Sequence, residues 1–184
     1  MKIIDILNEV MELGRSNKKA EALAKLNVIE DQLAAEPNIQ KFAGLLYQRL
    51  GDDDKSLHYL TLAKKGLPND AEIYFSIGCH YTDNSQQMEA IDYFLKAIEL
   101  DSALPTAYEY CARAYEIVGD LDNALKLAEK ACAFAQNIFP FINLGRIQIR
   151  SSDLTAAAET FERVDELYPD EILPDIGRKR VQAL

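Results

Sequence analysis

The chain has 184 residues, a formal net charge of −10 and a pI near 4.7, with 48% hydrophobic and 27% charged residues. This composition is ordinary for a single globular domain with a sizeable core. The excess of acidic residues argues against two classes of partner, because nucleic-acid phosphates and anionic lipids are both held by basic surfaces. We therefore expect neither nucleic-acid binding nor docking onto a membrane.

The cysteines and the amino terminus bear on the compartment. Cys79, Cys111 and Cys132 form no C-x-x-C pair and fall on expected helices, a pattern typical of reduced thiols. The first 14 residues mix apolar side chains with Asp5 and Glu9, so no secretory signal or membrane span is expected there. Together these features predict a cytoplasmic protein.

Residues 1 to 36 predict a pair of helices. The first 14 residues carry an apolar stripe at helical spacing, made of Ile3, Ile6, Leu7, Val10 and Met11. A second helix is expected from about Lys18 to Ala35. The pair lacks the landmarks that recur downstream, which favours a degenerate terminal cap. The alternative is that the stripe pairs with a partner or with a second copy, giving a homodimer.

From residue 37 onwards the sequence repeats itself at intervals of 34, 34 and 33 residues. A small residue recurs in the first helix of each copy, at Gly44, Gly78, Ala112 and Gly145. Tyr47, Tyr81 and Tyr115 follow three residues later, and only Gln148 breaks that series. In the second helix a small residue recurs at Ser56, Ala90, Ala124 and Ala157, and a further position at Leu60, Phe94, Ala128 and Phe161. So many landmarks with a common period indicate a repeat array.

This pattern resembles the tetratricopeptide repeat family. The second copy fits the family's motif with Tyr74, Ile77, Gly78, Tyr81, Ala90, Phe94 and Ala97. The resemblance implies an all-α fold, a right-handed α-solenoid of helix-turn-helix repeats, in a single domain spanning residues 1–184. We expect repeats at 37–70, 71–104, 105–137 and 138–170, a degenerate helix pair at 1–36 and a capping helix at 171–184.

The landmarks predict how the two helices of a copy pack. Helices that cross at close range need small residues at the contact, so we expect Gly78 to meet Ala90 within one copy, with Tyr81 and Phe94 filling the space to the next.

The run Asp52, Asp53 and Asp54 is expected to cap the second helix of the first copy, since carboxylates accept hydrogen bonds from free N–H groups there.

The resemblance also implies a function, which is protein–protein interaction without catalysis, through a groove lined by the first helix of each copy. Helical spacing selects the groove residues. They are Lys41, Leu45, Arg49, Glu72, Phe75, Cys79, Asp83, Glu109, Arg113, Glu116, Ile142, Arg146, Ile149 and Arg150. Arg113, Arg146 and Arg150 would hold carboxylates of an extended acidic peptide. Alternatively, Glu109 and Glu116 neutralise these arginines within the chain, and the sequence leaves both possibilities open.

Catalytic signals are weak. The two histidines, His58 and His80, lie on different copies, and Cys79 and His80 diverge by about 100° around a helix because they are adjacent. We therefore expect no enzyme activity, no metal and no cofactor, and a protein or peptide as partner. The alternative function is a chaperone or regulatory subunit, such as a bacterial secretion-type repeat chaperone, acting through the amino-terminal helix or by self-association.

Overall fold

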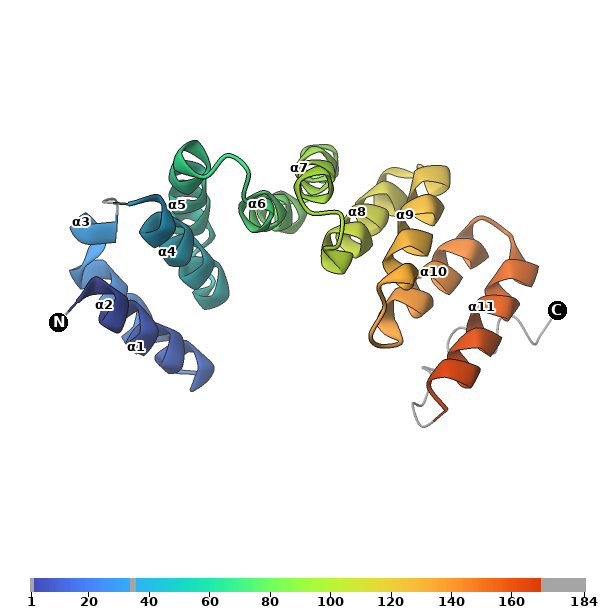
Figure 1. Cartoon of the computed structure of the whole chain (residues 1–184), viewed down its shortest axis with the longest axis horizontal. Coiled ribbons are helices and arrows are strands. Elements are labelled where there is room, and N and C mark those ends of the chain that lie inside the picture. The colour runs from blue at the N-terminus through green and yellow to red at the C-terminus, as the bar shows by residue number, and fades with distance from the viewer. Residues whose placement is uncertain (1, 34–35, 170–184) are drawn as a thin grey trace. The chain divides into compact units, whose positions relative to one another are not determined.

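A computed structural model describes residues 2–33 and 36–169, and within these ranges the chain forms helices and no strands (Figure 1). This confirms the all-α prediction. The helices fall into two compact units, an amino-terminal unit (residues 1–83) and a carboxy-terminal unit (residues 84–184). The amino-terminal unit contains α1 (Ile3–Arg15), α2 (Lys19–Val28), α3 (Glu30–Leu33), α4 (Pro37–Leu50), α5 (Asp53–Gly66) and α6 (Ala71–Asp83). The carboxy-terminal unit contains α7 (Gln87–Leu100), α8 (Pro105–Val118), α9 (Leu121–Ala133), α10 (Phe139–Arg150) and α11 (Leu154–Leu167). The capping helix predicted for residues 171–184 lies outside the described residues.

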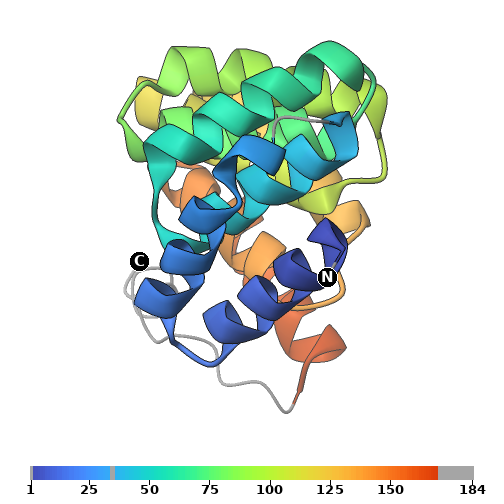
Figure 2. The same cartoon turned by 90° about the vertical axis from the view of Figure 1, so that its left-hand side faces the viewer.

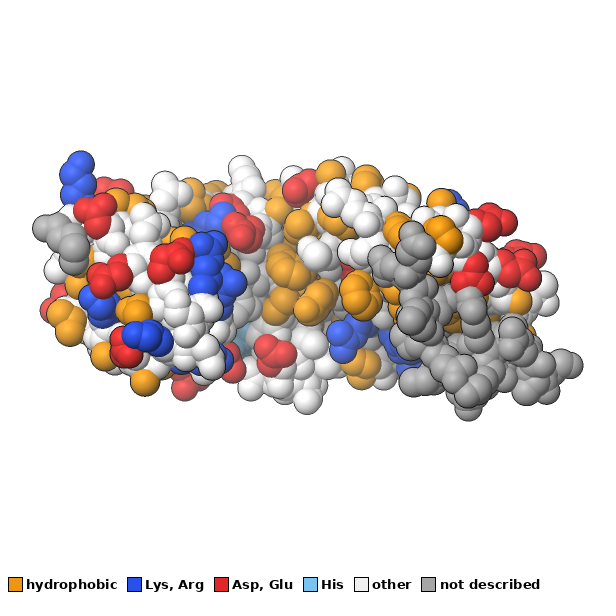
Figure 3. Space-filling model, turned by 90° about the horizontal axis from the view of Figure 1, so that it is seen from below, with side chains coloured by type: hydrophobic (Ala, Val, Ile, Leu, Met, Phe, Trp, Pro, Cys, Tyr) orange, Lys and Arg blue, Asp and Glu red, His pale blue; other side chains and the backbone are white. Residues whose placement is uncertain are grey.

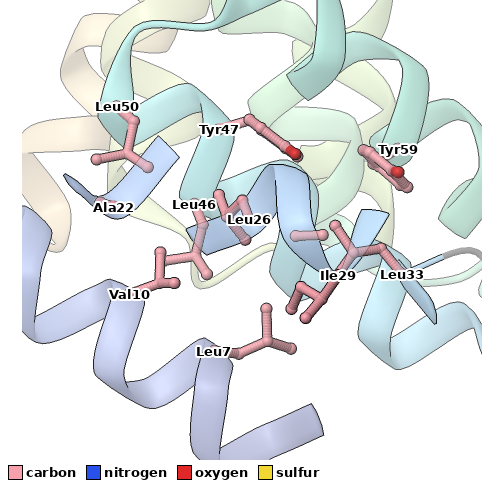
Figure 4. Close-up of a cluster of buried hydrophobic side chains, with 11 residues drawn as sticks. Leu7, Val10, Ala22, Leu26, Ile29, Leu33, Leu46, Tyr47, Leu50 and Tyr59 are labelled. Atoms are coloured by element: carbon pink, nitrogen blue, oxygen red, sulfur yellow. The ribbon is translucent and has the colours of Figure 1, made fainter. Parts of the chain in front are cut away.

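The amino-terminal helix pair is packed into its unit. Helices α1 and α2 run side by side (Figure 2), and Leu7 and Val10 of α1 are fully buried. Both side chains point towards Leu26 of α2 and Leu46 of α4 (Figure 4). The inner part of the predicted apolar stripe is therefore used within the chain, as a terminal cap requires.

The second helix differs from its prediction, because it is interrupted at Ile29. Helix α2 ends at Val28, and the short α3 begins at Glu30. The turn buries Ile29, which is 5% exposed, and leaves Val28 84% exposed. Two adjacent β-branched residues have low helix propensity, so core contacts of Ile29 can outweigh an uninterrupted helix. Lys55 of α5 fastens this turn through its Nζ, which lies 2.8 Å from Oε2 of Glu30.

Glycine and aspartate set the turns between paired helices. Gly51 and Gly119 end α4 and α8 with φ of 83° and 90°, a left-handed conformation that glycine adopts without strain. Asp52 and Asp120 then cap the next helices, accepting hydrogen bonds of 3.1 Å from the N–H groups of Lys55 and Asn123. The capping role predicted for the aspartate run is confirmed at Asp52.

In two copies, the glycine of the first helix makes room for a large side chain of the second helix. A Cβ placed on Gly44 would lie 2.7 Å from Cγ of Leu60, and one on Gly145 would lie 2.5 Å from Cζ of Phe161. These distances concern the first and fourth copies, and the contact of Gly78 with Ala90 in the second copy stays a prediction. Leu60 and Phe161 thus pack inside their own helix pairs, because the missing side chain leaves room for them.

In the carboxy-terminal unit, α9 packs against both α8 and α10, and α8 also contacts α10. The shared core contains Ala112, Ala128, Leu144 and Ile147, all at most 7% exposed. The small side chains of Ala112 and Ala128 let the helices approach closely. Helices α8 and α10 therefore lie close enough for their side chains to line one pocket. No helix among the described residues is both long and apolar enough to span a bilayer.

Candidate functional site

A buried carboxylate joins α8 to α10. Glu116 of α8 is 2% exposed, and its Oε1 accepts hydrogen bonds from Nη1 of Arg146 and, at 2.9 Å, from Nη1 of Arg150. Nη1 of Arg150 also lies 3.3 Å from the backbone oxygen of Glu116. A buried carboxylate requires such paired donors, because removing an unpaired charge from water costs several kcal/mol or more. The two arginine side chains remain 45% and 50% exposed.

A pocket of about 280 Å³ opens at this cluster. It is lined by Arg113, Glu116, Ile117, Asn143, Arg146 and Arg150. Arg113 lies over the ring of Tyr110, with 5.9 Å between the guanidinium carbon and the ring centroid. Ile117 is 55% exposed, so the pocket offers an apolar surface beside its cationic groups. On the face shown in Figure 3, Lys and Arg side chains lie beside hydrophobic ones to the left of the grey residues.

Helical spacing places these side chains. On α8, Arg113 and Ile117 are four residues apart, and on α10, Asn143, Arg146 and Arg150 are separated by three and four. Each set therefore occupies one face of its helix. Pro140 lies in the first turn of α10, where its missing N–H has little effect, and Arg150 ends the helix, where a cation is favoured.

The structure brings together four of the predicted groove residues, Arg113, Glu116, Arg146 and Arg150. It adds Asn143, which the sequence analysis missed although it shares the spacing of the two α10 arginines. One expectation is corrected: Glu116, placed on a wet face by its position, is buried by the guanidinium groups.

Three predicted groove residues of the same unit lie elsewhere. Ile142 and Ile149 are partly buried and pack against the core between α10 and α11, so they are not the exposed apolar groups that helical position indicated. Glu109 is half-buried, and desolvation raises the pKa of its carboxyl. Its charge makes a small contribution to the raised pKa of the Cys132 thiol in α9, which is mainly due to burial. Glu109 is not part of the pocket lining.

In the amino-terminal unit, predicted groove residues pair with one another. Nζ of Lys41 in α4 lies 2.7 Å from Oδ2 of Asp70 and 2.7 Å from Oε2 of Glu72. Burial lowers the pKa of Lys41, but the hydrogen bonds to these two carboxylates outweigh that effect and leave it raised. Lys41 and Glu72 are thus brought together, each satisfying the other's charge.

The other candidates of that unit vary in exposure. Leu45, Phe75 and Cys79 are partly buried, whereas Arg49 and Asp83 are exposed. Burial, with a smaller effect of Asp83, raises the pKa of the Cys79 thiol to about 12. In the part of the chain that the structure describes, no group of three or more His, Cys, Asp or Glu residues is arranged to hold a metal ion.

A second, apolar pocket lies between α1 and α2. It has a volume of about 370 Å³ and is lined by Ile6, Ala24, Lys25, Val28 and Ile29. Nζ of Lys25 lies 2.9 Å from Oε1 of Glu9, so the charge of the lysine is paired across the two helices. Val28, in this lining, is 84% exposed.

Sequence comparison identifies the repeats independently. The tetratricopeptide repeat profile matches residues 71–104 and 141–171. The chain is also 26% identical, over 125 residues, to interferon-induced protein with tetratricopeptide repeats 2 from Cricetulus griseus. That match covers 57% of this chain and 25% of the hamster protein, so the chain spans about a quarter of this relative's length.

Solved structures share the fold. MamA from Desulfovibrio magneticus RS-1 is 22% identical with a TM-score of 0.77, over 91% of this chain and 96% of that one. YrrB, described as a tetratricopeptide repeat protein with an unusual peptide-binding site, is 18% identical with a TM-score of 0.72, over 100% of this chain and 93% of that one. The fold is an α-solenoid of such repeats. The chain therefore contains tetratricopeptide repeats, matched at residues 71–104 and 141–171, within a fold that these proteins share.

Proposed function

We propose that the chain is a non-enzymatic interaction module that binds a segment of another protein in the pocket between α8 and α10. The observation that carries this proposal is the pair of half-exposed guanidinium groups held by the buried Glu116. Arginines fixed in this way lose little conformational freedom on binding, and preorganisation of this kind favours affinity. Tetratricopeptide repeats support protein–protein interaction in general, and YrrB is described as having a peptide-binding site.

The neighbouring groups fit a protein ligand better than a small metabolite. Ile117 and the ring of Tyr110, which are 55% and 38% exposed, lie beside the cationic groups on α8. A surface that alternates apolar and charged groups along a helix matches the alternating side chains of an extended peptide. With a net charge of −10, the chain as a whole fits a protein partner better than nucleic acid or anionic lipid. We place this partner in the cytoplasm, because all three cysteines are free thiols.

Site-specific cross-linking in cells tests this proposal. A photoreactive amino acid replaces Ile117 at the pocket, and in a matched variant it replaces Leu167 of α11, which is 51% exposed. We expect a discrete cross-linked partner from position 117, lost when Arg146→Glu is added, and none from position 167. Identical cross-links from both positions, or cross-links that survive Arg146→Glu, would contradict the proposal.

The predicted groove residues of the amino-terminal unit extend the same proposal. Phe75→Glu tests them, since a carboxylate there should weaken recovery of the partner if α6 also contacts it. Helicity measured by circular dichroism should stay unchanged. Full recovery of the partner with Phe75→Glu would confine binding to the carboxy-terminal unit.

A contact through the amino-terminal helix pair is the second candidate. The observation in its favour is Val28, 84% exposed beside the apolar pocket of α1 and α2. Such a surface would serve a chaperone or regulatory subunit, or a homodimer. Light scattering tests the homodimer on the full chain and on Val28→Ser, which leaves the buried core intact. A dimer that dissociates in Val28→Ser favours this candidate, and a monomer in both proteins argues against self-association through this surface.

A further inference from the structure

Resting on the proposed function, we infer that the pocket between α8 and α10 recognises a peptide carboxylate next to an apolar side chain. The cluster of guanidinium groups supplies the first half of this specificity. Arg113, Arg146 and Arg150 line the pocket, and Glu116 is the one acidic residue of its lining. Three cations against one carboxylate leave two positive charges in a chain whose net charge is −10.

The ion pairs within the chain do not exhaust these arginines. Each guanidinium has five N–H donors in a planar fork, and the bonds to Glu116 engage Nη1 of Arg146 and Nη1 of Arg150. About half of each side chain is exposed and both side chains line the pocket, which leaves its open side as the route for a ligand. A ligand carboxylate would approach from that side and take up two parallel hydrogen bonds, the geometry that arginine and carboxylate prefer.

Glu109 does not line the pocket. It lies on α8 one turn before Arg113, it is half-buried, and burial raises the pKa of its carboxyl. Of the two glutamates that were candidates for neutralising the arginines, only Glu116 lies in the pocket, and it contacts two of the three arginines. Arg113 stacks instead on Tyr110.

The apolar half of the specificity comes from Ile117. It is 55% exposed and shares the pocket lining with Arg113, four residues before it on the same face of α8. A pocket of about 280 Å³ accommodates one or two side chains and is too small for a folded domain. The ligand is therefore a short stretch in which a carboxylate group neighbours an apolar residue.

The carboxylate has two possible sources, an Asp or Glu side chain and the carboxyl terminus of the partner. The probe that separates them is a random peptide library displayed in two formats, with free and with blocked carboxyl termini, selected against the full chain. We expect enrichment of acidic residues beside apolar ones. Enrichment in both formats identifies a side-chain carboxylate, and enrichment only with free termini identifies the terminal one.

Binding of the selected peptides is then measured by fluorescence anisotropy with matched variants of both molecules. Replacing the peptide Glu or Asp by Gln or Asn, or amidating its terminus, should weaken binding about tenfold, the effect of losing a charge-assisted pair. Arg146→Lys should weaken it similarly, because lysine keeps the charge but loses the fork. Arg15→Ala should change nothing, since Arg15 lies on α1 and pairs with the exposed Glu12.

The outcomes separate this inference from the proposed function. Neutral or basic peptides that are selected, and that lose affinity in Arg146→Ala, would overturn the carboxylate specificity while leaving the pocket as a binding site. Peptides whose affinity is the same in Arg146→Ala, Arg150→Ala and the wild-type chain would overturn both. Equal affinities for Arg146→Lys and wild type would show that only overall charge matters, which contradicts recognition by the fork.

Discussion

Nη1 of Arg150 in α10 lies 2.9 Å from Oε1 of Glu116 in α8, and in this ion pair the glutamate side chain is buried while the arginine side chain is half-exposed. We expect Glu116→Gln to lower the free energy of unfolding by about 1–3 kcal/mol, because two hydrogen bonds lose their charge assistance at a buried site. The matched control is Glu12→Gln, which breaks an exposed pair with Arg15. Its expected effect is below about 1 kcal/mol. Equal effects in urea unfolding would contradict a buried role for Glu116.

Glu116 should also be visible through the arginines. In the wild-type chain the Nε–Hε NMR signals of Arg146 and Arg150 should be sharp, because Glu116 holds both side chains. In Glu116→Gln we expect these signals to broaden, while methyl signals of Leu144 and Ile147 in the nearby core stay in place. Unchanged arginine signals would mean that the arginines are ordered without Glu116.

Glycine substitutions test the close packing of the paired helices. A Cβ at Gly44 would lie 2.7 Å from Cγ of Leu60 and 3.1 Å from its backbone nitrogen, so Gly44→Ala should destabilise by about 1–3 kcal/mol. Gly14→Ala is the control in the same unit, where the nearest atom, Cδ2 of Leu50, is 3.5 Å away. That change should stabilise α1 by about 0.5–1 kcal/mol through helix propensity. If the urea midpoints of Gly44→Ala and Gly14→Ala move in the same direction, the close contact between Gly44 and Leu60 is contradicted.

The sequence predicts the helices well because local residues set them. Gly51 and Asp52 end one helix and begin the next through contacts within a few residues, and so do Gly119 and Asp120. The break at Ile29 could not be predicted in this way, since it depends on which of two adjacent apolar residues finds room in a core built from α1 and α4. Local propensity alone is a weak guide there.

The candidate site was predicted in part. Arg113, Arg146 and Arg150 follow from helical spacing, and Asn143 could have been found by the same spacing. The burial of Glu116 depends on partners 30 and 34 residues away, and no local pattern records that pairing. Helical spacing assigns Ile142 and Ile149 to the groove, but both side chains pack against the core between α10 and α11 and are partly buried there.

The buried thiols give the stability a dependence on alkaline pH. Burial raises the pKa of Cys111 and of Cys132 from 9.0 to about 12, as it does for Cys79. The folded chain therefore keeps these protons where the unfolded chain loses them. This contribution to stability is complete below about pH 9 and falls as the pH rises towards about 12.

Urea unfolding of the wild type and of Cys111→Ala between about pH 8 and 10.5 measures this effect. We expect the wild type to lose more stability than the variant across this range. Alkylation of the native thiols at about pH 8 should also be slow, and fast in urea, since the thiolate is the reactive form. If the stability of the two proteins depends on pH in the same way, the raised pKa of the Cys111 thiol is contradicted.

The amino-terminal helix should be indispensable to its unit. Leu7 is fully buried against the core that α2 and α4 complete, so Leu7→Ala should cost about 2–5 kcal/mol. Ile4 on the same helix is 46% exposed, and Ile4→Ala should stay within about 0.5 kcal/mol. Thermal unfolding checks both variants. A mild effect of Leu7→Ala would indicate that α1 is a loosely attached arm.

The most direct test of the pocket is an NMR titration of the arginine side chains of the full chain with a peptide selected from the library. The signals of Arg113, Arg146 and Arg150 should shift together and saturate at one peptide concentration, while the signal of Arg15 stays in place. Shifts confined to other arginines such as Arg49, or small uniform shifts without saturation, would contradict binding between α8 and α10.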